Sequence, residues 1–225
     1  MFSPQGPSLR ELFVQAMSSV ERGYDLLAPK FDYTPFRTPP GVLEATAAAL
    51  PGPFESGLDV CCGTGAGLSV LSSVGCARIT GVDFSAGMLD AARRAHPAST
   101  LVRADARALP FAAEFDLAVT FGALGHFLPE ERPAVFEGVR RALRPGGLFA
   151  FPLGDVPPVA SAAGVATLGF DVAMRVRNAV WRPPFVMYYR TTPLPALRAD
   201  LAAAGFTVVS TDLITPGCRL LLARR

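Results

Sequence analysis

Short apolar segments alternate with helical segments from residue 58 to residue 153, and this alternation limits the possible folds more than any other feature. Strands are predicted over 58–62, 78–82, 100–104, 115–121 and 148–153, and helices through 68–74 and over about 85–96 and 129–143. Strands this apolar, separated by helices, indicate a parallel sheet covered on both faces. Ligands of such α/β sheets bind at the carboxyl ends of the strands.

The flanking regions follow different patterns. Ser8 and Glu11 form a capping-box pattern before a run of apolar residues at helical spacing to Leu27, and Pro29 is expected to end this helix. We expect it to pack as a cap, with Glu11, Gln15 and Glu21 on its exposed face. A second helix is predicted over 42–50. The alternation stops after Gly154, and a helix over 195–204 and an antiparallel hairpin of strands 207–213 and 219–223 complete the chain. The predicted organisation is an N-terminal helical cap (1–52) and one domain (53–225) with an insertion at about 154–192.

Composition excludes several classes of protein. The 225 residues carry a net charge of +2, which argues against a dedicated nucleic-acid binder, and half of them are apolar, enough for a sizeable core. No CxxC pair occurs among Cys61, Cys62, Cys76 and Cys218, so no zinc site is indicated. The N-terminus shows no secretory signal, and the apolar stretch 156–170 is too short to span a bilayer. We therefore expect a soluble cytoplasmic protein with reduced thiols and no membrane or nucleic-acid partner.

A glycine-rich loop follows the first predicted strand. It reads Asp59-Val60-Cys61-Cys62-Gly63-Thr64-Gly65-Ala66-Gly67 and leads into a helix. Glycines let a ligand approach the backbone, and the helix N-terminus offers free N–H donors. The dinucleotide pattern G-x-G-x-x-G, counted from Gly63, requires glycine at position 68, where Leu68 stands, so a nicotinamide dinucleotide is disfavoured.

Acids follow the next two strands. Asp83, 24 residues after Asp59, is placed to accept the two hydroxyl protons of a ribose, or alternatively to cap the next helix. Asp105, followed by Ala106, could accept from an adenine amino group or be an exposed turn acid. Three successive strand ends therefore converge on one ligand, and this conjunction is more specific than any single motif.

The sequence resembles the class I S-adenosylmethionine-dependent methyltransferases over roughly residues 24–225, in the small-molecule branch that includes ubiquinone and menaquinone methyltransferases. The leader over 24–32 is similar to that branch's Y-D-x-x-A-x-x-Y-D cap. The other matching segments are 58–65, 81–89, 104–111, 115–119 and 143–147. The resemblance implies a Rossmann-like, seven-stranded, mostly parallel sheet with an antiparallel last strand and helices on both faces.

The resemblance also implies roles for individual residues. Asp59, Gly63 and Gly65 would hold the methionine end of S-adenosylmethionine, and Asp83 would hold its ribose. Met88, Asp105 and Ala106 would surround the adenine, and Thr120 and Phe121 would pass near the sulfonium. The remaining residues assigned to the cofactor are Tyr24, Cys61, Thr64 and Phe84. Cys61 departs from the family pattern, which has glycine at this position.

Methyl transfer is an in-line displacement at an activated carbon, so the protein mainly has to align the nucleophile and exclude water. His126 is the candidate general base, with helix capping or packing as the alternative. Trp181, Tyr188 and Tyr189 are candidate acceptor contacts, with strand packing as the alternative, and their aromatic character suggests an apolar or aromatic acceptor.

The predicted function is therefore a metal-independent methyltransferase that converts S-adenosylmethionine to S-adenosylhomocysteine while methylating a small organic acceptor. The alternatives are a non-catalytic cofactor-binding or partner protein, an NAD-dependent oxidoreductase and an RNA methyltransferase. The identity of the acceptor, the atom methylated and the choice between monomer and homodimer stay open.

Overall fold

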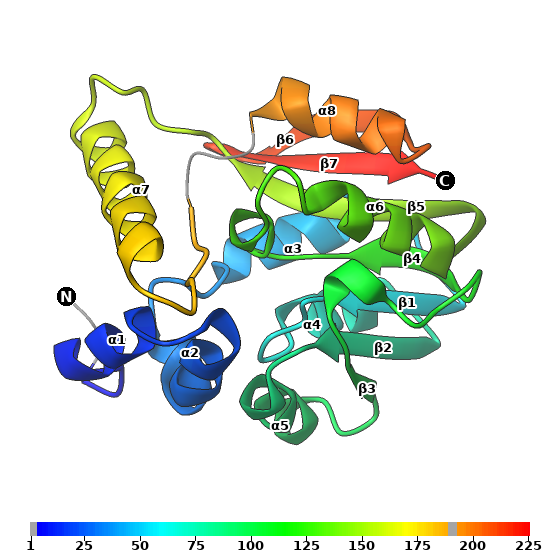
Figure 1. The fold of residues 1–225 in the computed structure, drawn as a ribbon. Helices are drawn as coiled ribbons and strands as arrows, with labels where there is room; N and C mark the ends of the chain where they lie inside the picture. Colours follow the sequence, from blue (N-terminus) through cyan, green and yellow to red (C-terminus); the bar gives the residue numbers. More distant parts are fainter. Residues whose placement is uncertain (1–3, 189–192) are drawn as a thin grey trace.

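A seven-stranded sheet in the order β3-β2-β1-β4-β5-β7-β6 lies at the centre of the computed structural model, which describes residues 4–188 and 193–225 (Figure 1). Strands β1 to β5 pair in parallel, and β7 runs antiparallel to both β5 and β6. This confirms the predicted mostly parallel sheet with an antiparallel last strand. The strands are β1 (Ser56–Val60), β2 (Arg78–Asp83), β3 (Thr100–Arg103), β4 (Phe115–Val119), β5 (Leu143–Gly154), β6 (Thr207–Thr215) and β7 (Cys218–Arg224).

Helices cover both faces of this sheet. One layer contains α3 (Pro40–Ala49), α4 (Ala66–Ser73) and α5 (Ala86–Ala95), and the other contains α6 (Arg132–Ala142) and α8 (Leu194–Ala203). Successive residues of β5 alternate between the two cores: Phe149 packs with Phe136 of α6, whereas Ala150 belongs to the cluster that includes Leu71 of α4. Successive side chains of a strand point to opposite faces, and helices bury both faces. Both sides of each strand are therefore apolar.

The order of the strands fixes the place of a ligand crevice. The chain moves outward from β1 through β2 to β3 and then returns to pair β4 on the other side of β1. The loops after β1 and β4 therefore diverge, and the crevice between such loops is where open α/β sheets bind ligands. Two single-turn 3-10 helices, η2 (Ala106–Ala108) and η3 (Leu124–His126), follow β3 and β4.

The N-terminal region contains two helices where the periodicity predicts one. Helix α1 (Leu9–Ala16) and helix α2 (Val20–Leu27) are separated at Ser18 and Ser19. The Ser19 side chain accepts a hydrogen bond from the Arg22 N–H and so starts a new helix. The chain then continues past Pro29 as a 3-10 helix, η1 (Ala28–Tyr33). We call α1, α2 and η1 the outer cap, because α3 packs directly on the sheet layer.

The exposed face of α1 differs in part from the predicted one. Glu11 is exposed and Glu21 of α2 is half-buried, but Gln15 is buried. Of the apolar stripe, Leu9 and Phe13 are 80% and 66% exposed, so the face that meets the protein is rotated from the predicted one.

The insertion contains a helix that its prolines and aromatic residues did not reveal. Helix α7 (Ala162–Val180) has 19 residues and begins at Ser161, whose side chain accepts a hydrogen bond from the Gly164 N–H. Figure 1 shows α7 at the same end of the molecule as α1 and α2, away from the sheet. Within the described residues, no helix combines the length and the apolar character needed to cross a membrane.

Candidate functional site

The loop after β1 adopts a left-handed backbone at three positions. Cys61, Gly63 and Gly65 have φ angles of 58°, 52° and 108°. A side chain makes this conformation costly, so Cys61 occupies a position suited to glycine. No atom lies within 4 Å of where a Cβ on Gly63 would stand, so the backbone here faces open space. The neighbouring Thr64 donates its hydroxyl hydrogen to Asp32 of the outer cap.

Asp59 is a fully buried carboxylate on β1. Neither of its oxygens makes a well-aligned hydrogen bond with a described residue, although the backbone N–H groups of Gly67 and Leu68 lie close enough to act on its charge. Burial, together with the nearby Asp83, raises its pKa well above the usual value, and the backbone N–H groups of Leu68 and Gly67 oppose this shift only partly. A Cβ on Gly67 would come within 2.4 Å of the carboxylate, so the close approach depends on glycine. A buried carboxylate whose oxygens lack well-aligned hydrogen bonds is typical of a ligand site.

Asp83 joins two of the strand-end loops. Its Oδ2 accepts from the Gly63 N–H at 2.9 Å, and its Oδ1 accepts from the Ser85 N–H at 2.9 Å. Burial raises its pKa, although these N–H groups favour the charged form. A carboxylate has about four acceptor positions, so two are still available to a ligand. The alternative role predicted for Asp83 was to cap the next helix. In the structure the side chain of Ser85 caps α5 instead.

The predicted adenine-side residues lie after β2 and β3. Met88 and Ala106 are buried and Phe84 is half-buried. The Asp105 carboxylate pairs with Arg107, which lowers the pKa of Asp105, and Arg107 also pairs with Glu131. Asp105 therefore caps η2 and is held in an ion pair.

The loop after β4 supplies the other side of the crevice. The Thr120 hydroxyl donates to the Val60 carbonyl oxygen at 2.7 Å, which ties the end of β4 to the end of β1. Phe121 is half-buried beside it. Gly122, which the sequence did not single out, has a φ of 69°, and no atom lies within 4 Å of where a Cβ on it would stand. The backbone thus faces open space on both sides of the switch point.

His126 links three distant segments. Its Nδ1 lies 2.7 Å from the Val186 carbonyl oxygen, which can only accept, so Nδ1 carries the hydrogen of the neutral ring. Its Nε2 then accepts from the Tyr24 hydroxyl at 2.8 Å. Burial lowers the pKa of His126, which keeps the ring neutral at pH 7. The structure thus connects the predicted base to Tyr24 of the outer cap.

An aromatic and apolar cluster surrounds this pair. Met174, Phe185 and Tyr188 are buried together, and Phe185 stacks on Tyr24 with ring centroids 6.3 Å apart. The Tyr188 hydroxyl accepts from Asn178, and its backbone N–H bonds to Gly125. Trp181 lies elsewhere, 51% exposed at the end of α7. Tyr189 falls outside the described residues.

Two acids of the leader were missed as site residues. Asp25 Oδ1 accepts from the Ser85 hydroxyl at 2.6 Å and from the Gly87 N–H at 2.9 Å, and Asp32 accepts from Thr64. Together with Tyr24, these contacts fasten the outer cap to the loops after β1, β2 and β4. The similarity of the leader to a family cap motif was the signal that could have identified them.

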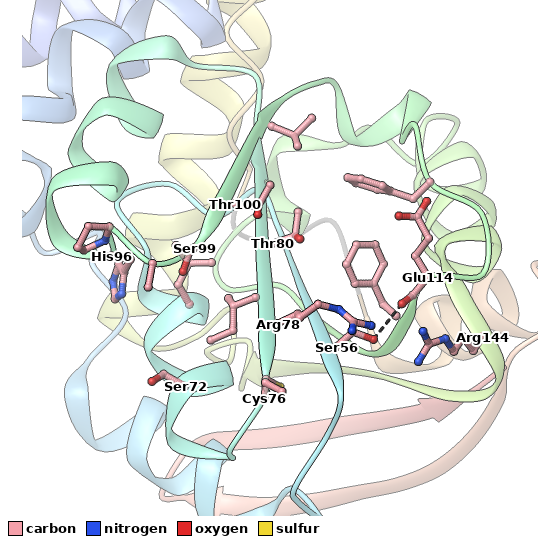
Figure 2. Close-up of a pocket in the computed structure, with 18 of the residues that line it drawn as sticks. Ser56, Ser72, Cys76, Arg78, Thr80, His96, Ser99, Thr100, Glu114 and Arg144 are labelled. Carbon is pink, nitrogen blue, oxygen red and sulfur yellow. Dashed lines mark hydrogen bonds between the residues drawn. The ribbon is translucent and has the colours of Figure 1, made fainter.

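A cavity of about 740 Å³ lies at the opposite end of the sheet (Figure 2). Ser56, Arg78, Thr100 and Phe115, the first residues of β1 to β4, line it. The positive charges of its two arginines are balanced by ion pairs. Arg78 pairs with Glu55, and Arg144 pairs with Glu55 and Asp116. None of the loop residues described above lines this cavity, so it is separate from the candidate site. No metal-binding cluster of His, Cys, Asp or Glu is found in residues 4–188 and 193–225.

The chain is similar to known methyltransferases in sequence and in fold. A family profile described as "Methyltransferase domain" matches residues 58–147, from β1 into β5. An uncharacterized methyltransferase of Synechocystis is 33% identical over 174 residues, which is 73% of each chain. The crystal structure of an S-adenosylmethionine-dependent methyltransferase from Mesorhizobium loti has the same fold, with a TM-score of 0.60, 24% identity and coverage of 82% of this chain and 98% of that one.

Two further relatives are named for different acceptors. A probable phthiotriol/phenolphthiotriol dimycocerosates methyltransferase of Mycobacterium ulcerans is 40% identical over 118 residues, 51% of this chain and 43% of its own. A yeast tRNA (carboxymethyluridine(34)-5-O)-methyltransferase is 33% identical over 130 residues, 57% of this chain and 45% of its own. The first is named for dimycocerosates and the second for a tRNA.

Proposed function

We infer that this chain, which belongs to the class I S-adenosylmethionine-dependent methyltransferase family, methylates a small, apolar or aromatic organic molecule. The observation that carries the proposal is the hydrogen-bonded Tyr24–His126 pair, surrounded by the apolar cluster of Met174, Phe185 and Tyr188. Two polar groups held in an otherwise apolar surrounding are typical of a small-molecule pocket.

The residues present fit the cofactor S-adenosylmethionine. Asp59, buried without a well-aligned hydrogen bond to a described residue, suits the cationic amino group of the methionine end. Asp83 retains acceptor capacity for the ribose hydroxyls. Gly63 supplies backbone that faces open space, whereas the His96 ring lies where a Cβ on Gly65 would stand. Met88 and Ala106 offer apolar contacts to adenine.

When bound, the cofactor supplies an activated methyl group for in-line displacement. The chain's own contribution is alignment and the exclusion of water, because the outer cap covers the crevice through Tyr24, Asp25 and Asp32. Thr120 and Phe121, at the end of β4, border the position assigned to the reacting carbon. No metal is required in this scheme.

Tyr24 and His126 provide a route for a proton. An acceptor hydroxyl must lose its proton as it becomes methylated. His126 Nε2 already accepts from Tyr24, so a proton reaches the imidazole through the Tyr24 hydroxyl: Tyr24 passes its hydrogen to Nε2 and receives the acceptor's. Substrate, phenol and imidazole then form one chain.

The first test is transfer of a labelled methyl group from S-adenosylmethionine to panels of acceptors. We expect product with phenolic, quinol-like or lipid-like molecules and none with total tRNA. Salt-sensitive methylation of tRNA would instead support the RNA alternative, and cofactor binding without turnover on any acceptor would support the non-catalytic alternative.

Site variants separate catalysis from cofactor binding. We expect Tyr24→Phe and His126→Gln each to lower kcat about 10²-fold or more while the cofactor Kd, measured by calorimetry, changes by less than about threefold. Tyr33→Phe, which changes an exposed tyrosine at the end of η1, serves as the control. Unchanged kcat in both variants would reduce the pair to a packing role.

A further inference from the structure

The outward face of α7 is apolar along the whole helix. The exposed side chains at helical spacing, which we call the α7 stripe, are between 41% and 80% exposed: Val165, Leu168, Val172, Val176 and Val180. The polar residues Asp171 and Asn178 are instead buried against the protein. An ordinary surface helix has the reverse arrangement, with its polar side toward water.

Helix α1 adds two large apolar side chains to this end of the molecule. Leu9 and Phe13 are exposed beside the charged Arg10 and Glu11, and Gln15 is buried. The two helices belong to one end of the molecule (Figure 1), and the Arg177 guanidinium donates to the Ser18 carbonyl oxygen at the end of α1. We call the α7 stripe with Leu9 and Phe13 the apolar end surface. An exposed apolar surface of this extent marks an interaction site.

Basic residues flank this surface. Arg10 of α1, Arg22 of α2 and Arg182 after α7 are exposed, and none of them forms an ion pair with a described residue. Arg175 of α7 is also exposed, with its guanidinium 4.5 Å from the centre of the Tyr188 ring. Two acids of α1 and α2 are paired, Glu11 with Lys30 and Glu21 with Arg103, whereas Asp171 of α7 is buried. The charge left around the apolar end surface is therefore positive.

We propose that the apolar end surface docks on an anionic lipid bilayer. Apolar side chains with arginines at their margin are the combination by which helices lie in a membrane interface, since the stripe enters the acyl boundary and the arginines meet the headgroups. A second copy of this chain fits less well, because pairing would bring two sets of arginines together. The docking differs from the sequence-based expectation of no membrane partner.

The position of α7 would bring a docked bilayer close to the proposed acceptor site. The inner face of α7 contributes Met174 to the cluster beside Tyr24 and His126, so one helix separates the bilayer from the acceptor site. This step rests on the proposed function: an acceptor dissolved in the membrane could reach the site without crossing water.

The test is co-sedimentation of the full chain with vesicles of phosphatidylcholine alone or mixed equally with phosphatidylglycerol. We expect binding to the mixed vesicles that weakens as salt is raised. The double variant Val172→Asp/Val176→Asp should bind about tenfold more weakly for each valine changed. The control is Leu213→Asp, which alters a side chain of similar exposure on β6 and should bind as the unchanged protein does.

Charge is tested separately. Arg10→Glu/Arg182→Glu should lose about fivefold in affinity for mixed vesicles per residue, with no loss of folding. No binding to either vesicle, or full binding by the valine variant, would overturn the proposal. So would a dimer by light scattering that the valine substitutions convert to monomer, because the surface would then cover a second copy. None of these readouts needs turnover or cofactor, so failed docking and failed methyl transfer are told apart.

Discussion

At the scale of single residues, the site combines features that cost stability. Asp59 is buried without a well-aligned hydrogen bond to a described residue, and Cys61 holds a left-handed backbone angle that favours glycine. Burial also raises the pKa of the Cys61 thiol well above its usual value. Because the thiolate is the reactive form, this cysteine is expected to be unreactive. These are the places where a ligand, rather than the fold, explains the residue.

Asp59→Asn should stabilise the ligand-free protein and weaken cofactor binding. The pKa of Asp59 is raised in the folded state, so its charged form carries a penalty that is absent below the unfolded-state pKa and grows as pH rises through it. Removing an unsatisfied buried charge should raise Tm by a few degrees, at about 2–4 °C per kcal/mol.

Thermal melts and calorimetry across pH check this prediction. The gain in Tm should be larger at pH 8 than at pH 5 and should vanish below about pH 3, where Asp59 is protonated in both the folded and the unfolded state. A gain independent of pH would show that the carboxylate is not destabilising the fold.

Gly67→Ala tests the close approach between α4 and Asp59. A methyl group 2.4 Å from the carboxylate forces Asp59 or the start of α4 to move. We expect cofactor affinity to fall at least about tenfold. Gly169→Ala, with no atom near its Cβ position on α7, is the control. Equal affinities in calorimetry would contradict the assigned geometry.

At the scale of elements, single polar contacts join helices to each other and to the strand-end loops. Arg132 of α6 pairs with Asp200 of α8 at 2.8 Å while being 4% exposed. Asp25 of α2 receives hydrogen bonds from the loop after β2. Each contact fixes one element on its neighbour, so each can be tested by removing one partner.

Arg132→Met should destabilise the protein by about 3–5 kcal/mol, because it leaves the Asp200 carboxylate without its charged partner. The double variant Arg132→Met/Asp200→Leu should recover most of this loss. Urea denaturation measures both free energies of unfolding. Equal stability of the single and double variants would mean that lost packing, not charge, is responsible.

Asp25→Ala should loosen the outer cap. It removes both acceptor contacts to Ser85 and Gly87, so amide hydrogen exchange over residues 20–33 should quicken and cofactor affinity should fall about fivefold. Asp212→Ala, an exposed acid on β6, provides the matched comparison. Exchange rates identical to those of the unchanged protein would show that the outer cap is held by other contacts.

At the scale of the whole molecule, the crevice at the carboxyl ends of the strands is bordered by loops from both sides of the switch point and by the outer cap. A ligand bound there touches segments more than a hundred residues apart in the chain, as the Tyr24–His126 contact already does. Ligand binding should therefore stabilise the fold as one unit.

S-adenosylhomocysteine at about a hundred times its Kd should add about 2.7 kcal/mol to the free energy of unfolding and raise Tm by about 5–10 °C. Differential scanning fluorimetry measures the shift. The Asp83→Ala variant should lose it while keeping a cooperative transition. A full shift in this variant would remove Asp83 from the ribose site.

The succession of strands and helices along the chain, the glycine loop and the acids at the ends of β2 and β3 were predictable because strand length, glycine and turn chemistry are local properties. The division of the first helix at Ser19 and the helix in the insertion were not, since both depend on contacts with distant segments. The Tyr24–His126 pairing likewise joins residues that no local pattern connects.

The sequence by itself determined the strands of the sheet, their alternation with helices and the residues at the strand ends, because these follow from local periodicity and residue type. Tertiary structure alone decided which side of α1 and α7 faces outward, since a helical stripe shows that residues share a face but not what that face meets. It buried Gln15 and Asn178 and left Leu9 and Val176 exposed. That reversal, absent from any local pattern, defines the apolar end surface.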